Sequence, residues 1–62
     1  MKMDEIMNFI GEMSYSQGFY GRLYRDIKEL EKNDEEGYAN LVEELEGQNF
    51  KDNLDLVMYL EG

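Results

Sequence analysis

Hydrophobic residues recur along most of this chain at the three- and four-residue spacing of an amphipathic α-helix. The first group consists of Met3, Ile6, Met7, Ile10 and Met13. Their spacing predicts a helix that ends between Gly11 and Ser14. Asp4 and Glu5 fall in its first turn, where the helix dipole favours acidic side chains. The methionines are interpreted as core residues, because their flexible side chains fill irregular gaps.

A second and longer group predicts a helix that runs to about Lys32. Its apolar residues are Tyr20, Leu23, Tyr24, Ile27 and Leu30. Ser14 or Ser16 is the expected N-cap, and Ser14 with Gln17 has the spacing of a capping box. The segment therefore has both an apolar face and a start signal.

Two glycines, Gly18 and Gly21, interrupt the start of this second segment. Each Gly inside a helix costs about 1 kcal/mol relative to Ala, so a reason for them is expected. Close approach of another helix, or a later helix start, is the favoured explanation. The alternative is an anion site at exposed backbone amides near a helix N-terminus.

A third group of apolar residues predicts a helix in the middle of the second half. Its members are Tyr38, Leu41, Val42 and Leu45. Asn33 or Asp34 is the expected N-cap, and Gly47 is the expected residue just after the helix end.

The last segment, residues 54–60, has a pattern that fits either a helix or a buried strand. Asp52 is a plausible N-cap, with Asp55 three residues later, and a lone strand would have no partner to pair with. We therefore predict a helix that is apolar on most sides because it lies centrally in the core. Phe50, in the preceding loop, is expected to close the end of the core.

Four short helices with brief connections predict an all-α fold, a compact bundle of three to four short helices. The 62 residues form a single domain, residues 1–62. A chain of this size buries only about 60% of the surface that its unfolded form exposes, so modest stability is expected.

The amino-acid composition excludes several kinds of catalytic and metal-binding site. The chain has no Cys and no His, so it lacks thiolate nucleophiles, sulfur-ligated zinc sites and the usual general base. The acidic stretch at residues 33–37 does not fit a calcium-binding EF-hand loop, because Lys32 would occupy the first ligand position. No phosphate-binding or dinucleotide-binding motif is present. We expect no enzymatic activity, no cofactor and no metal.

The longest apolar run has five residues, far below the roughly 20 that span a bilayer. The acidic N-terminus is unlike a secretory signal. We expect no membrane partner and a cytoplasmic location.

The formal net charge of −9 is distributed unevenly along the chain. Residues 1–33 carry six acids and five bases, whereas residues 34–62 carry nine acids and one base. One predicted helical face gathers Glu35, Glu36, Glu43, Glu44 and Glu46. This acidic face is interpreted either as a solvated surface or as a binding surface for a basic protein partner, imitating a phosphate backbone.

The second helix also has a basic stripe, formed by Arg22, Arg25, Lys28 and Lys32. A recognition helix for DNA would need such a face. The overall charge opposes contact with phosphate, so no direct nucleic-acid binding is expected. We instead expect ion pairs within the helix, Arg22 with Asp26 and Arg25 with Glu29.

Aromatic residues crowd around the start of the second helix, more than one turn of core needs. They are Tyr15, Phe19, Tyr20 and Tyr24. Tyrosine is a common anchor at protein interfaces, so these residues are the second candidate binding site, and a homodimer could cover them.

Two stretches, residues 16–23 and residues 48–61, resemble small uncharacterised proteins encoded by phages and mobile elements of Gram-positive bacteria. The resemblance implies binding to host proteins without assigning any residue a role. Three hypotheses follow: a non-enzymatic protein that acts through protein contacts, a DNA-mimic inhibitor of a host nucleic-acid-binding enzyme, and a plain structural domain.

Overall fold

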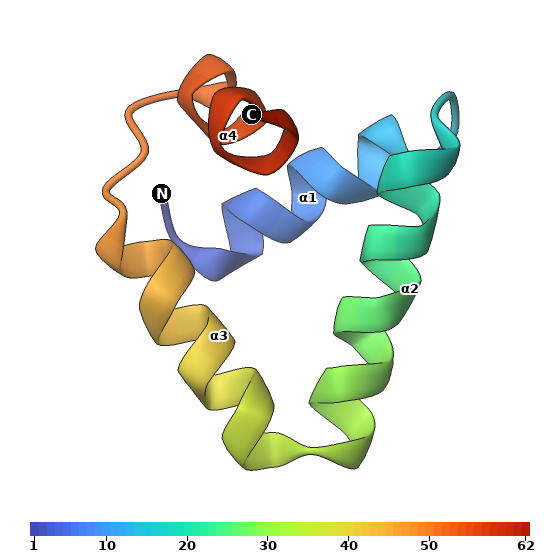
Figure 1. Ribbon diagram of the computed structural model, residues 1–62, viewed down its shortest axis with the longest axis vertical. Helices are drawn as coiled ribbons and strands as arrows, with labels where there is room; N and C mark the ends of the chain where they lie inside the picture. The colour runs from blue at the N-terminus through green and yellow to red at the C-terminus, as the bar shows by residue number, and fades with distance from the viewer.

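A computed structural model describes all 62 residues. The chain forms four helices and no strand: α1 (Met3–Met13), α2 (Gly18–Asn33), α3 (Glu35–Gly47) and α4 (Asn53–Glu61). In Figure 1, α1, α2 and α3 form the sides of a triangle, and α4 lies on the outer side of α1. The all-α, compact helical fold is confirmed, and the last segment is a helix rather than a strand.

The core is built around α1. Eight apolar residues are buried, namely Met3, Ile6, Ile10, Tyr20, Ile27, Leu45, Phe50 and Leu56. Helix α1 supplies three of them, which is the most of any helix. Phe50 lies in the loop before α4, where it closes the end of the core as predicted.

The prediction that α4 is central is wrong. Only Leu56 of this helix is buried, whereas Leu54 and Met58 are 65% and 66% exposed. These two residues stand four positions apart, so they share one outward face of α4. An apolar helix covered on all sides needs neighbours around it, and three other short helices do not surround α4.

Neither Ser14 nor Ser16 is the N-cap of α2, contrary to the prediction. Ser14 directly follows α1, and its hydroxyl donates a hydrogen bond to the Gly11 carbonyl at 2.5 Å. Gln17 occupies the N-cap position of α2 and makes no side-chain cap hydrogen bond. Neither serine caps α2, because this helix starts only at Gly18.

This later start accounts for Gly18, where an added Cβ would meet no atom within 4 Å. At Gly21 the nearest atom would be the Ser14 carbonyl oxygen, at an ordinary 3.7 Å. The close approach lies instead at Gly11, where an added Cβ would be 3.2 Å from Cε1 of Tyr24. Helices α1 and α2 therefore meet tightly at Gly11.

The acidic caps of α3 and α4 form as predicted. Asp34 accepts a hydrogen bond from the Gly37 amide, and Asp52 accepts one from the Asp55 amide, both at 3.0 Å. The end of α3 differs, because the helix includes Gly47 and the left-handed residue is Asn49, with φ 55°. Asparagine tolerates this conformation better than most residues, which allows the chain to turn toward Phe50.

Candidate protein-binding surfaces

The outer face of α3 carries most of the predicted acidic surface. Glu35, Glu36, Glu43 and Glu44 are all exposed, and none of them makes a side-chain hydrogen bond or an ion pair. The only ion pair in the structure joins Lys28 to Glu31, at 3.8 Å. The negative charge of α3 is therefore presented to solvent without neutralisation by the chain itself.

Glu46 does not belong with this surface. Its carboxylate is partly buried and accepts a hydrogen bond from the backbone amide of Met3 at 2.8 Å. The amides in the first turn of a helix lack partners within the helix, so Glu46 satisfies one of them from α3. Its role is to hold the start of α1 against α3, which corrects its assignment to the binding face.

The basic stripe of α2 does not form the predicted pairs. Neither Arg22 with Asp26 nor Arg25 with Glu29 makes an ion pair. Lys28 does pair, with Glu31 at 3.8 Å, and its ammonium lies 5.7 Å from the centroid of the Tyr24 ring. Solvation of exposed side chains competes effectively with such pairs, which are worth only about 0.3–0.5 kcal/mol on a helix surface.

Tyr20 is a core residue rather than an interface residue. Its side chain has no exposed surface and packs edge-on against Phe9 and Phe19. Its hydroxyl donates a hydrogen bond to the carboxylate of Glu61 at the end of α4. Burial raises the pKa of Tyr20 to about 12, and the hydrogen bond and negative charge of Glu61 add to this effect. Tyr20 is therefore removed from the predicted aromatic binding site.

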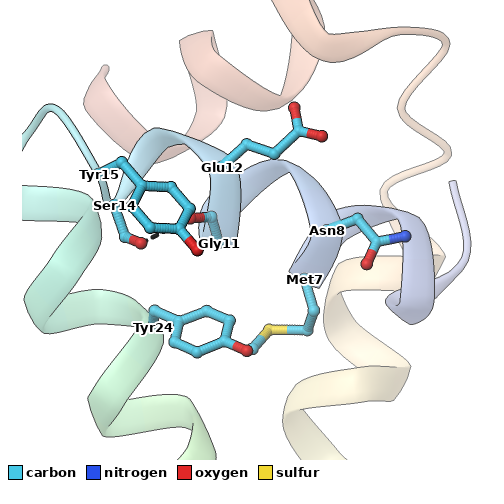
Figure 2. A pocket seen from close by; sticks show the side chains of 7 residues that line it. All are labelled: Met7, Asn8, Gly11, Glu12, Ser14, Tyr15 and Tyr24. Atoms are coloured by element: carbon cyan, nitrogen blue, oxygen red, sulfur yellow. Dashed lines mark hydrogen bonds between the residues drawn. The ribbon is translucent and has the colours of Figure 1, made fainter.

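The other three aromatic residues of this group divide between two places. Tyr15 is 94% exposed in the turn after α1, and Phe19 is 45% exposed and packs edge-on against Tyr20. Tyr15 and Tyr24 line one open hollow of about 420 Å³, with Gly11 between them (Figure 2). In this view the Tyr24 hydroxyl lies beside the Met7 side chain, and Glu12 points to the opposite side of α1.

A second open hollow, of about 380 Å³, continues from the first along the inner side of α1. The two share Met7, Asn8 and Tyr24. The second lies between α1, α2 and α3. Its further lining residues are Met3, Asp4, Lys28, Glu31 and Tyr38. Burial raises the pKa of Tyr38, and Glu31, Asp4 and Glu46 reinforce this effect while Lys28 opposes it. Two tyrosines, carboxylates and one ammonium therefore surround a single space.

Sequence reasoning missed this second hollow. The sequence pattern places Tyr38 in an apolar stripe and Asp4 in the first turn of a helix, and it assigns no role to Glu31. One sequence feature pointed to it: the apolar stripes of two helices include tyrosines, Tyr24 and Tyr38. A core without polar groups would have aliphatic residues at these positions. A tyrosine at such a position places its hydroxyl at the edge of the core, beside polar groups.

No group of three or more His, Cys, Asp or Glu side chains is placed to hold a metal ion. None of the four helices combines the length and the apolar character that crossing a membrane requires. No protein-family model matches the sequence, and no curated protein or solved structure matches it either. Function is therefore inferred from the side chains of this chain alone.

Proposed function

We propose that this chain is a non-enzymatic cytoplasmic protein that binds a basic protein partner through the outer face of α3. The observation that carries the proposal is the set of four exposed carboxylates on one helix, none of them paired, at Glu35, Glu36, Glu43 and Glu44. They lie in the half of the chain with a net charge of −8. Like charges on one short helix repel each other, and a basic partner relieves that repulsion.

The arrangement of the carboxylates favours an extended contact. Glu36 and Glu43 are seven residues apart, so they lie on the same side of α3, about 10 Å apart along its axis. Both point away from the buried residue Leu45, on the opposite side of the helix. A row of negative charges on a rigid helix resembles a nucleic-acid backbone, so a nucleic-acid-binding enzyme of the host is the narrower candidate partner.

The test uses the double variant Glu36→Gln/Glu43→Gln. Its matched control is Asp26→Asn/Glu29→Gln, which removes the same charge from exposed positions on α2. Mass spectrometry identifies as the partner a host protein that the wild type and the control capture in larger amounts than the α3 variant does. Affinity for that partner should fall about two- to thirtyfold, the sum of two exposed ion pairs.

The dependence of partner binding on salt concentration is the second test. Raising the ionic strength from about 0.1 M to about 1 M shortens the Debye length from about 10 Å to about 3 Å, so binding through exposed charges should weaken steeply. A partner that binds the α3 variant as well as the control, with no response to salt, would contradict the proposal. The face would then serve solubility alone.

A homodimer is the second candidate, favoured by the exposure of Tyr15 and Phe19, which are four residues apart in the chain. Sedimentation of a dilution series should show a dimer that the variant Tyr15→Ser/Phe19→Ser converts to monomer. A wild-type monomer at micromolar concentration would remove this candidate.

A further inference from the structure

The second hollow is open to solvent, and its lining residues come from three helices. Asp4 of α1 and Glu31 of α2 supply carboxylates, while Tyr24 of α2 and Tyr38 of α3 supply aromatic rings. Met7 provides an apolar, polarisable wall. Its volume of about 380 Å³ lies within the range of about 300–1,000 Å³ that is typical of small-ligand sites.

The chain already places one cation in this space. The ammonium of Lys28 lies 3.8 Å from a carboxylate oxygen of Glu31 and 5.7 Å from the centroid of the Tyr24 ring. A cation within about 6 Å of an aromatic ring is attracted by its negative face. Lys28 and Glu31 are about half exposed, so this internal contact is loose and can be displaced.

We propose that this hollow is an arginine-binding pocket, which receives one arginine side chain of the basic partner and displaces Lys28. The inference rests on the proposed function, because it names the group by which that partner is anchored. A guanidinium is planar, stacks on tyrosine rings and bonds carboxylates with two parallel N–H groups. Lysine has a compact, strongly hydrated ammonium that does not stack in this way.

Charge complementarity favours an arginine side chain of a basic protein as the ligand of the second hollow. The two wall carboxylates outnumber the single ammonium of Lys28, and the carboxylate of Glu46 lies close enough to act on Tyr38. A second copy of this chain, with its net charge of −9, is repelled by the same field. An arginine from a basic protein is attracted by it.

The test is an NMR titration of the whole protein with N-acetyl-arginine amide, in parallel with N-acetyl-lysine amide. Saturable shift changes should centre on Met7, Tyr24 and Tyr38, with arginine binding more tightly than lysine. Shifts that never saturate, or that are equal for both probes and spread over α3, would overturn the proposal.

Two variants with matched controls distinguish binding in the pocket from a general effect of net charge on arginine binding. Lys28→Gln should tighten arginine binding about two- to fivefold because the resident competitor is gone, while Lys32→Gln changes the net charge equally without touching the pocket. Asp4→Asn should weaken binding by a similar factor, and Asp26→Asn is its control. Equal effects of each variant and its control would overturn the proposal. Circular dichroism of each variant checks that it is folded.

Failure of the pocket and failure of the proposed function are distinguishable. If Glu36→Gln/Glu43→Gln weakens partner capture while Lys28→Gln and Asp4→Asn change nothing, the α3 proposal stands and the pocket fails. If the arginine probe binds as described but partner capture ignores the α3 variant, the pocket stands and the proposed function fails.

Discussion

The hydroxyl of Tyr20 donates a hydrogen bond to the carboxylate of Glu61, 41 residues further along the chain. This contact joins the start of α2 to the end of α4. A negative charge at a helix C-terminus is normally unfavourable, because it opposes the helix dipole. The buried phenol gives Glu61 a partner that offsets this cost, so this contact contributes to holding α4 on the core.

The stability of the protein is expected to fall in alkali because of Tyr20. In the unfolded chain its pKa is near the ordinary value of 10, whereas in the folded protein it is about 12. The stabilisation from this group is complete below about pH 10 and is lost as the pH rises to about 12. The free energy of unfolding, measured by urea denaturation, should drop by an amount on the order of 2 kcal/mol over this interval.

The variant Tyr20→Phe isolates this contribution, because the other tyrosines and the lysines still ionise in it. It should be less stable than the wild type at neutral pH and lose less stability between about pH 10 and about pH 12. Parallel pH profiles of the two proteins would contradict the prediction.

The effect of Glu61→Gln should depend on Tyr20. In the wild type the substitution weakens a charge-assisted hydrogen bond and should destabilise the protein by about 1 kcal/mol. In the Tyr20→Phe background the same change only removes an unfavourable charge from the helix end, and it should stabilise by up to about 0.5 kcal/mol. A double-mutant cycle measures this coupling, and purely additive effects would show that the contact contributes nothing.

The two faces of α4 should respond differently to truncation. Leu56→Ala removes a fully buried side chain and should cost about 2–5 kcal/mol, enough to unfold much of a protein this small. Leu54→Ala and Met58→Ala alter exposed side chains, and each should change stability by less than about 0.5 kcal/mol. Thermal melts followed by circular dichroism make the comparison. A large loss at Leu54 would show that α4 is oriented differently.

Glu46 should contribute to stability, unlike the exposed glutamates of the same helix. Glu46→Ala leaves the Met3 amide without its acceptor and should cost about 1 kcal/mol. Glu43→Ala, on the exposed face of the same helix, removes only a repelling charge and should be neutral or slightly stabilising. Urea denaturation of both variants at neutral pH tests this, and equal losses would place Glu46 back with the acidic face.

Local signals in the sequence were sufficient for much of the fold. The apolar spacing of the first three helices, the caps at Asp34 and Asp52, and the position of Phe50 were all predictable. They depend on interactions within a few residues, which the order of amino acids alone specifies. The first residue of α2 is harder to predict from the sequence. Ser14 was expected to cap the start of α2, but it lies at the C-terminal end of α1.

The sequence by itself determined the helical class and the uneven charge, because periodicity and composition do not depend on which residues are neighbours in space. Only the tertiary structure decided that Tyr20 is buried, that Glu46 accepts a hydrogen bond from the first turn of α1 and that α4 exposes Leu54 and Met58. It also brought Asp4, Tyr24, Glu31 and Tyr38 around one space. These residues come from different helices, so their proximity depends on how the helices pack, which one-dimensional spacing does not encode.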